Sequence, residues 1–432
     1  MSVPAAGRRD SLLPWAIWSL GAAFYSFAFF QRVAPSAMTH ELMRDLAVGA
    51  AALGNLSAAY FYVYGGLQIP IGVALDRWGT RWLLMGCAAL GAAGSVLFAL
   101  SPDFGTAFLG RLLIGAGASV GYLGCLKLAA VWFPPQRFSL LVGFITPFGM
   151  TGAVLGQAPL GALVEAAGWR APMLGAAGFA AVILLLLWLT RLVAPRRPEG
   201  AAAPPPSLAH LRASLARALR TPQVWVIALA TASANMPLLA FAGLWGVPYL
   251  VHSYGLSREL AGLGTSIMLI GWALGAPFLG WLSERLRRRK ALFLLGAAVG
   301  LASWLIVTLA APLPIPLLYA LFAVAGIGSG ATILGFVLIR EGVGDEASGS
   351  VSALVNTFLM GMAALFQYLI GALLDLWWDG EMAGGVRLYS SEAFASALWI
   401  LPATTAVSCV AALFLRETHP SRIGRPLLEP AP

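Results

Sequence analysis

Twelve apolar runs, each long enough to cross a lipid bilayer as a helix, follow one another along this 432-residue chain. A helix needs about 20 mostly apolar residues to span the hydrocarbon core. Only 10% of the residues are charged and 59% are hydrophobic, whereas a soluble domain carries about 25% charged residues. We therefore predict an all-α polytopic membrane protein with twelve transmembrane helices, at residues 15–37, 53–75, 82–100, 104–128, 138–164, 171–192, 223–251, 260–282, 291–311, 315–339, 351–376 and 394–415.

Basic residues predict the orientation of the chain. With the N-terminus in the cytoplasm, 20 of the 27 Lys and Arg residues fall on the cytoplasmic side, and four (Arg44, Arg170, Arg258 and Arg387) fall in outward loops. Cytoplasmic loops are enriched in Lys and Arg. We therefore predict a multi-pass protein of the cell inner (plasma) membrane with both termini in the cytoplasm. The net charge of +9 then requires no nucleic-acid partner.

One long polar break divides the twelve spans into six and six. We predict an N-terminal six-helix bundle over 1–192, a cytoplasmic linker over 193–222, a C-terminal six-helix bundle over 223–415 and a cytoplasmic tail over 416–432. Leucines at helical spacing opposite arginines indicate a short amphipathic helix within the linker, on the inner leaflet. A plain tether without lipid specificity is the alternative. The pattern consists of Leu208, Leu211, Leu215 and Leu219 with Arg212, Arg217 and Arg220.

The two halves repeat a short charged loop. Span 2 is followed by Gly72, Asp76, Arg77 and Arg81, and span 8 is followed at a constant offset of 208 by Gly280, Glu284, Arg285 and Arg289. Duplicated six-span halves are a transporter architecture, with the substrate site between the halves near the bilayer midplane. The repeat therefore indicates a transporter.

Several ordered motifs resemble those of the major facilitator superfamily. Gly72-Val-Ala-Leu-Asp76-Arg77-Trp-Gly79-Thr-Arg81 is similar to its signature loop between helices 2 and 3, and Arg111-Leu-Leu-Ile-Gly115-Ala-Gly117 to its helix-4 signature. Phe133-Pro-Pro-Gln-Arg137 and Gly168-Trp-Arg170 resemble its 4–5 loop and its entry to helix 6. The resemblance covers the chain outside the tails. It implies two pseudo-symmetric six-helix bundles that transport a solute by alternating access.

The repeated loops are candidates for a conformational latch. Acidic and basic residues at the cytoplasmic ends of helices can pair with charges and helix ends of the opposite half. Such pairs would stabilise the outward-open state; a solvated turn is the alternative. The predicted latch comprises Gly72, Asp76, Arg77, Gly79, Arg81, Glu284, Arg285 and Arg289.

Two arginines inside spans are the main candidates for substrate binding. Arg32 in span 1 and Arg111 in span 4 are each predicted about 9 Å outward of the midplane. The resemblance implies that helices 1, 4, 7 and 10 line the central path, and Tyr25 and Phe29 share a helix face with Arg32. Because no Asp or Glu lies in the middle of a span, an anionic substrate group is expected to supply the missing charge. The alternatives are a structural Arg111 and an interfacial Arg32.

Weaker candidates on other spans, where helix–helix packing is the alternative role, are Asn235, Trp245, Asn356 and Gln367. Lys127 lies deeper towards the cytoplasm in span 4, and snorkelling of its stem is the alternative role. All four histidines (His40, His210, His252 and His419) fall in predicted loops or tails, so no intramembrane proton relay is predicted.

We predict a carrier for a small carboxylate-bearing solute: an amino acid, a short peptide or an organic acid. The stretch Phe29-Phe-Gln31-Arg32-Val-Ala-Pro35-Ser36 resembles a bacterial branch related to amino-acid and peptide carriers. The alternative is a proton-coupled multidrug or metabolite efflux antiporter, weakened because span 5 lacks an adjacent Gly-Pro pair. A non-transporting sensor is a further alternative.

No enzymatic activity, cofactor or metal is predicted, since the three cysteines are scattered through apolar runs. The expected partners are the lipid bilayer and a small-molecule substrate, with no nucleic acid, and the protein is expected to function as a monomer.

Overall fold

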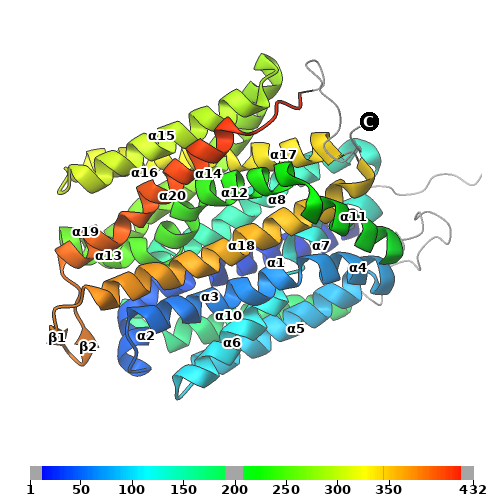
Figure 1. Cartoon of the computed structure of the whole chain (residues 1–432). Helices are drawn as coiled ribbons and strands as arrows, with labels where there is room; N and C mark the ends of the chain where they lie inside the picture. The colour runs from blue at the N-terminus through cyan, green and yellow to red at the C-terminus, as the bar shows by residue number, and fades with distance from the viewer. Residues whose placement is uncertain (1–11, 190–207, 344, 420–432) are drawn as a thin grey trace, which may run out of the picture.

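The structure is a computed structural model and describes residues 12–189, 208–343 and 345–419. Long helices lie side by side in one elongated bundle (Figure 1). Eleven helical runs in the described part are long and apolar enough to cross a membrane, and a pair bent by 45° near Leu67 raises the number to twelve. The predicted helical membrane fold is confirmed.

The first half of the chain supplies six spans, several of them interrupted by short breaks. Its elements are α1 (Leu13–Val33), η1 (Ala34–Met38), α2 (Thr39–Asp45), α3 (Ala50–Gly66), α4 (Gln68–Trp78), α5 (Thr80–Ala99), α6 (Phe104–Ala118), α7 (Gly121–Trp132), α8 (Pro135–Leu155), α9 (Ala158–Ala167) and α10 (Arg170–Leu189).

The second half repeats this pattern after helix α11 (Leu208–Arg220), which lies within the predicted linker. Its elements are α12 (Pro222–Met236), η3 (Pro237–Trp245), α13 (Gly246–Tyr254), α14 (Arg258–Leu286), α15 (Arg289–Leu309), α16 (Ile315–Ser329), α17 (Thr332–Val343), α18 (Asp345–Leu376), β1 (Met382–Ala383), β2 (Val386–Arg387), α19 (Ser391–Leu398) and α20 (Ile400–Leu413). The two strands form an antiparallel hairpin.

The first span is longer than predicted. Its apolar run ends near Ala37, but η1 and α2 continue the helical path to Asp45. The polar residues that indicated a loop lie on α2, where Glu41 forms an ion pair with Arg258 of the other half. Tertiary pairing therefore keeps a polar segment helical.

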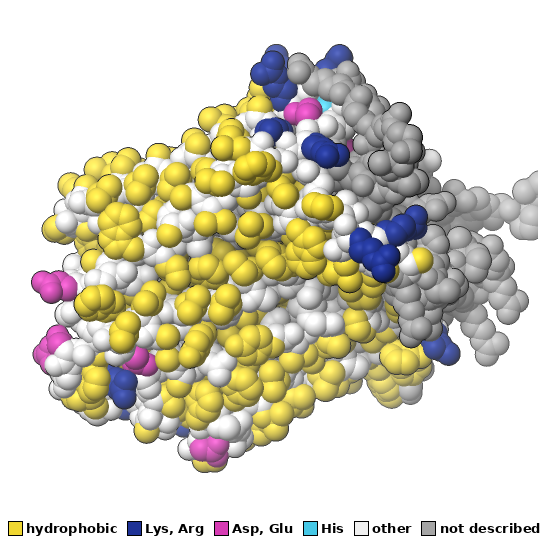
Figure 2. Space-filling view, in the orientation of Figure 1, with side chains coloured by type: hydrophobic (Ala, Val, Ile, Leu, Met, Phe, Trp, Pro, Cys, Tyr) yellow, Lys and Arg dark blue, Asp and Glu magenta, His cyan; other side chains and the backbone are white. Residues whose placement is uncertain are grey.

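The bundle has two chemically different ends. We call the end with β1, β2 and α2 the hairpin end, and the end with α4 and α11 the linker end (Figure 1). Figure 2 shows apolar side chains over the middle of one face, with Lys and Arg gathered mainly at the linker end. This distribution is typical of a protein that crosses a membrane between two wet surfaces.

Close backbone contact joins the halves towards the hairpin end. A Cβ atom at Gly54 of α3 would lie 2.4 Å from the carbonyl oxygen of Gln367 in α18, and one at Gly371 would lie 2.3 Å from that of Ala50. Since these contacts exclude any side chain, glycine sets the approach of α3 and α18.

Candidate functional site

Arg32 lies near the middle of the helical run Leu13–Asp45, inside an aromatic enclosure. Its guanidinium carbon is 4.3 Å from the ring centre of Phe29, 5.0 Å from that of Tyr64 and 5.7 Å from that of Tyr60. Phe61 completes the enclosure at 5.9 Å. Aromatic faces attract a cation, which helps to hold this charge in a dry environment.

The charge of Arg32 has no anionic partner among the described residues. The residue is 7% exposed, its Nε atom has no hydrogen-bond partner, and no carboxylate of the described chain forms an ion pair with it. An unpaired buried cation is costly. The arrangement is suited to a ligand that carries a carboxylate or a similar anion.

Arg111 has a different environment. It is fully buried; its Nη1 donates to the carbonyl oxygen of Gln31 at 2.7 Å and its Nη2 to that of Ser57 at 3.4 Å. These bonds connect α6 with α1 and α3. The geometry matches the structural alternative for Arg111, because its Nη1 and Nη2 donate to backbone oxygens of its own half, although its Nε, like that of Arg32, has no partner.

Tyr60 lies between the two arginines. The Arg111 guanidinium carbon is 5.4 Å from the Tyr60 ring centre, and the hydroxyl of Tyr60 donates to the carbonyl oxygen of Ala28 at 3.1 Å. A Cβ atom at Gly115 would lie 2.4 Å from the Tyr60 carbonyl oxygen. Close packing of α6 on α3 thus fixes the ring that both cations approach.

The predicted common face of Tyr25, Phe29 and Arg32 is present. The rings of Tyr25 and Phe29 meet edge to face at 4.9 Å, and Tyr25 also approaches Tyr122 at 6.0 Å. Lys127 lies further along α7, towards the linker end, and is half-buried. No described contact brings it to Arg32.

Trp245 and Gln367 meet inside the second half. The Trp245 Nε1 donates to the carbonyl oxygen of Gln367 at 2.9 Å, and the Gln367 Nε2 donates to that of Leu239 at 2.9 Å. Both contacts hold η3, a π-helix, against α18. Asn235 is buried with a partnerless Oδ1, whereas Asn356 is half-buried in α18.

Sequence reasoning missed Gln157, which joins the break between α8 and α9 to three elements, η1, η3 and α14. Its Oε1 accepts hydrogen bonds from Ser36 at 2.9 Å and from Thr265 at 3.0 Å. Its Nε2 donates to the carbonyl oxygen of Ala242 in η3 at 2.7 Å. A π-helix leaves carbonyl groups open to outside donors. A lone Gln in an apolar run gives no sequence signal for this position.

Sequence reasoning also missed the role of Asp375. Its carboxylate, at the end of α18, accepts hydrogen bonds from the backbone nitrogens of Ala50 at 3.2 Å and Ala51 at 2.9 Å. These nitrogens begin α3, whose preceding residue, Gly49, has no side chain to cap them. Asp375 therefore caps a helix of the opposite half and faces the positive end of its dipole.

Two neighbours hold the Asp375 carboxylate in place. Arg387 lies 3.0 Å from its Oδ1, and the hydroxyl of Tyr389 donates to the same atom at 2.6 Å. Burial and then this hydrogen bond raise the pKa of Tyr389, so its hydroxyl stays protonated. That hydroxyl also accepts a bond from the Ala50 nitrogen at 2.9 Å.

A third connection at the hairpin end is ionic. Arg258, at the start of α14, lies 2.6 Å from Glu41 of α2 and 3.7 Å from Glu165 of α9. Together with Gln157 and Asp375 it joins the halves at this end.

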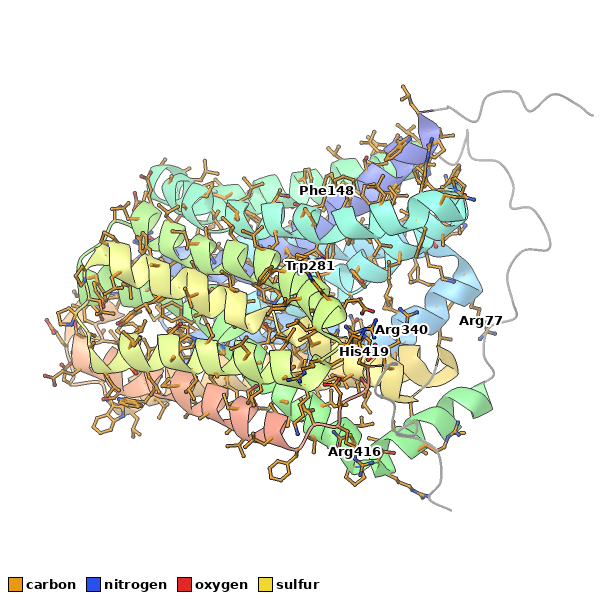
Figure 3. The ribbon with its side chains drawn as sticks, turned by 90° about the horizontal axis from the view of Figure 1, so that it is seen from above. Arg77, Phe148, Trp281, Arg340, Arg416 and His419 are labelled. Carbon is orange, nitrogen blue, oxygen red and sulfur yellow. The ribbon has the colours of Figure 1, made fainter. Side chains whose placement is uncertain are left out.

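The predicted latch residues lie at the linker end, around Arg77 and Arg340 in Figure 3. Arg289 is buried and binds Glu284 at 2.5 Å and Glu341 at 2.8 Å, both within the second half. The Arg81 Nη2 donates to the carbonyl oxygen of Trp188 at 3.4 Å. The Asp76 side chain lies outside the described residues.

Other latch positions have local roles. Gly79 adopts a φ of +83° between α4 and α5, a conformation that favours glycine. Arg77 is exposed, Gly72 has open space around it, and Arg285 stacks on Trp281 at 5.4 Å.

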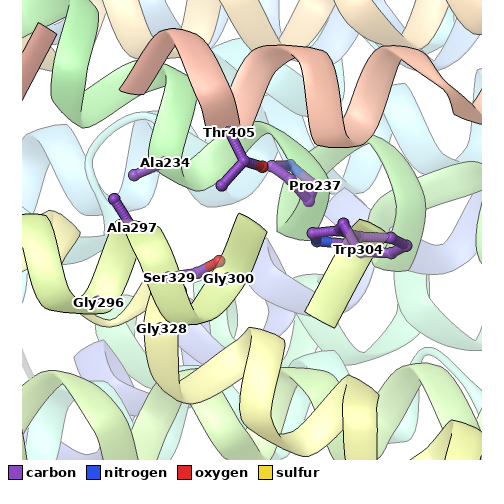
Figure 4. A pocket seen from close by; sticks show the side chains of 9 residues that line it. All are labelled: Ala234, Pro237, Gly296, Ala297, Gly300, Trp304, Gly328, Ser329 and Thr405. Atoms are coloured by element: carbon purple, nitrogen blue, oxygen red, sulfur yellow. The ribbon is translucent and has the colours of Figure 1, made fainter. Parts of the chain in front are cut away.

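A narrow pocket lies inside the second half (Figure 4). It is too tight for a water molecule, and its lining is mostly small residues of α12, α15, α16 and α20 around Trp304. We attribute it to helix packing within one half.

Comparisons with known proteins identify the family. The family model described as "Major Facilitator Superfamily" matches residues 19–247 and 238–431 of this chain. The "Membrane sensor protein UhpC" of Salmonella typhimurium is 23% identical over 443 residues, which cover 95% of this chain and 93% of that one.

Other relatives match shorter stretches. The "Uncharacterized transporter YybO" of Bacillus subtilis is 25% identical over 42% of each chain. The "Probable galactarate/D-glucarate transporter GudP" of the same organism is 24% identical over 45% of this chain and 44% of its own. The chain thus spans less than half the length of these two relatives.

Solved structures share the fold. A bacterial homolog of the human lysosomal transporter Spinster, in an inward-facing and occupied conformation, has a TM-score of 0.73 at 17% identity, over 94% of this chain and 96% of that one. The nucleoside transporter NupG, as a D323A mutant, also has a TM-score of 0.73, at 14% identity over 93% and 99%.

Proposed function

The chain belongs to the major facilitator superfamily of membrane transporters, and on that premise we propose that it carries a small carboxylate-bearing solute across the inner membrane. An amino acid, a short peptide or an organic acid would fit this description. The observation that carries the proposal is the buried guanidinium of Arg32 among Phe29, Tyr60 and Tyr64, which has no anionic partner in the described part of the chain.

The relatives support an anionic substrate. GudP is named for galactarate and D-glucarate, and a further relative from Arabidopsis thaliana is a probable anion transporter, 33% identical over 34% of each chain. A carboxylate would pair with Arg32 and relieve the cost of its burial. The aromatic rings would contact the apolar part of the solute.

The transport mechanism in this proposal is alternating access around Arg32. Gln157, Asp375 and Arg258 join the halves at the hairpin end, so the structure corresponds to a state closed on that side. The gathering of Lys and Arg at the linker end supports a cytoplasmic position for that end. In this proposal the structure is therefore closed on the outer side of the membrane.

Thermal-shift binding and liposome uptake test the substrate class. Purified protein would be screened against amino acids, dipeptides, organic acids, phosphates and sugars. We expect stabilisation by carboxylates, and we expect Arg32→Gln to lose it while the free protein keeps its melting temperature. Arg44→Gln is the matched control, because Arg44 is an exposed arginine at the end of the same helical run.

Each result has a defined meaning. Carboxylate binding that persists in Arg32→Gln contradicts the assigned role of Arg32. Uptake of cationic drugs alone would favour the efflux antiporter; a relative from Aspergillus clavatus named efflux pump patC is 34% identical over 24% of this chain. Binding without uptake would favour a sensor, the role named for UhpC.

A further inference from the structure

The linker helix α11 is packed against the bundle. It contacts α18 and α12, which both belong to the second half. Ala218 of α11 is fully buried and Leu215 is half-buried, whereas Arg217, Leu219 and Arg220 are exposed. The packing therefore gives two arginines and a leucine a fixed outward position, which a plain tether would not provide.

Hydrogen bonds fix the corner at which α11 meets α12. The Trp225 Nε1 donates to the carbonyl oxygen of Leu219 at 2.9 Å, and the Thr221 hydroxyl donates to that of Arg217 at 2.8 Å. The Trp225 ring meets Phe358 of α18 edge to face at 5.8 Å and stays exposed. An indole with its polar edge bonded and its ring open is typical of the boundary between hydrocarbon and headgroups. We therefore expect the last turn of α11 at the depth of the headgroups.

The end of α20 lies beside this corner. The Gln223 Nε2 donates to the carbonyl oxygen of Phe414 at 3.3 Å, which brings the residues after α20 next to the start of α12. Phe414 and Arg416 are exposed. In the shared orientation of Figures 1 and 2, Lys and Arg side chains lie over α11, next to an apolar face over α12, α18 and α20. The linker-end corner, as we call this surface, comprises Arg217, Leu219, Arg220, Trp225, Phe414 and Arg416.

The linker-end corner carries positive charge that the described chain does not neutralise. Arg217, Arg220 and Arg416 form no ion pair with a described carboxylate. The carboxylate of Glu417, the residue after Arg416, accepts from two backbone nitrogens at the start of α15, at 2.8 and 3.3 Å. Arginines above exposed aromatic side chains fit a molecule with a negatively charged head and an apolar body.

We propose that the linker-end corner binds anionic phospholipid of the adjoining leaflet, with its arginines at the headgroup and with Trp225 and Phe414 against the acyl chains. Guanidinium groups bind phosphate oxygens bidentately. A zwitterionic lipid carries the same phosphate, but its own cation cancels the charge, so the corner discriminates by net charge. This inference does not depend on the identity of the transported solute.

Lipid-selective quenching tests the proposal on the full-length protein. A fluorophore is attached at Ala216→Cys, an exposed position of α11, in a background with alanine at Cys87, Cys125 and Cys409. The vesicles mix phosphatidylglycerol and phosphatidylcholine, and one of the two carries a nitroxide quencher high on an acyl chain. Each arginine near an anionic surface contributes about 5-fold to lipid association. We therefore expect local association to favour phosphatidylglycerol by at least about 10-fold.

Variants separate the linker-end corner from general surface charge. Arg217→Gln with Arg220→Gln should reduce the preference to about 5-fold or less while quenching by phosphatidylcholine remains. Arg287→Gln with Arg288→Gln is the matched control, because it removes the same charge from exposed positions between α14 and α15 and should keep the parent preference.

Four outcomes would overturn the proposal. They are equal quenching by both lipids in the parent, an unchanged preference in the α11 variant, an equal loss in the control, and a preference that inorganic phosphate removes by competition. The last outcome would identify a site for the free anion. Because no solute is present, these outcomes are independent of the carboxylate proposal.

Discussion

The carboxylate of Asp375 at the end of α18 accepts a hydrogen bond of 2.9 Å from the backbone nitrogen of Ala51, the second residue of α3 in the opposite half. A helix normally finds its cap in the residue before it, but Gly49 offers no side chain there. The start of α3 is therefore capped only while the halves are together at the hairpin end. Opening of this end must leave those nitrogens to water.

We expect Asp375→Asn to weaken closure of the hairpin end. The amide has no negative charge to face the helix dipole, and its NH₂ group cannot accept from a second backbone nitrogen. The loss should be about 1–2 kcal/mol, or about 5- to 30-fold in the closed-to-open ratio. Spin-label distances across the hairpin end measure the ratio. Asp379→Asn is the control, since Asp379 accepts a local hydrogen bond from the backbone nitrogen of Glu381; an equal shift in both variants would refute the role of the cap.

Gln157→Leu should also favour the open hairpin end. Leucine has a similar size but loses the bonds to Ser36, Thr265 and the Ala242 carbonyl oxygen. A buried group left without its partner costs about 1–3 kcal/mol, so transport should slow and the distance distribution should change. Gln68→Leu is the control, because the Gln68 amide donates to the carbonyl oxygens of Tyr64 and Ser119, which both belong to the first half. If Gln68→Leu moves the distances as much as Gln157→Leu, the connecting role of Gln157 is wrong.

Arg111→Met should lower stability, in contrast to Arg32→Met. Methionine removes the donors to the carbonyl oxygens of Gln31 and Ser57, and the loss of a hydrogen bond from a charged donor costs about 1–3 kcal/mol. Arg32→Met removes a charge with no described anionic partner, so it should preserve or raise the melting temperature and abolish carboxylate binding. Thermal unfolding in detergent checks both variants. The reverse order of stability would exchange the roles of the two arginines.

Gly152→Ala should destabilise the first half. A Cβ atom there would lie 1.8 Å from the carbonyl oxygen of Ser26, so α1 and α8 would have to separate. We expect a loss of about 1–3 kcal/mol and reduced yield of folded protein. Gly143→Ala, on the same helix with nothing within 4 Å, should be neutral or slightly stabilising. Equal effects at both positions would contradict close packing as the reason for these glycines.

Asp76→Asn should reduce transport and leave expression largely unchanged. The proposed latch forms when the linker end closes, and Asp76 is the acidic residue of a basic loop. Uptake into liposomes is the measurement, with the hairpin-end distances as a second readout. Loss of the latch should increase the inward-facing population. Normal uptake by the variant would remove Asp76 from the mechanism.

Much of the fold could be predicted because it depends on local properties. A run such as 291–311 needs only its length and apolar character to be recognised as a span. The common face of Tyr25, Phe29 and Arg32 follows from helical periodicity alone. Span ends were less predictable: α2 carries His40, Glu41 and Arg44 and is still helical, because Glu41 pairs with Arg258 of another segment and Arg44 pairs with Asp45 of the same helix.

The sequence by itself determined the class of the protein: a chain with 10% charged residues must bury its helices in lipid, and its motifs identify the family. Only the tertiary structure decided which charges are satisfied. Arg32 and Arg111 are equivalent in a linear reading, yet one lies among aromatic rings and the other is bonded to two carbonyl oxygens. Asp375 and Ala51 are 324 positions apart. Partners so distant leave no local pattern, because hydrogen bonding depends on position in space.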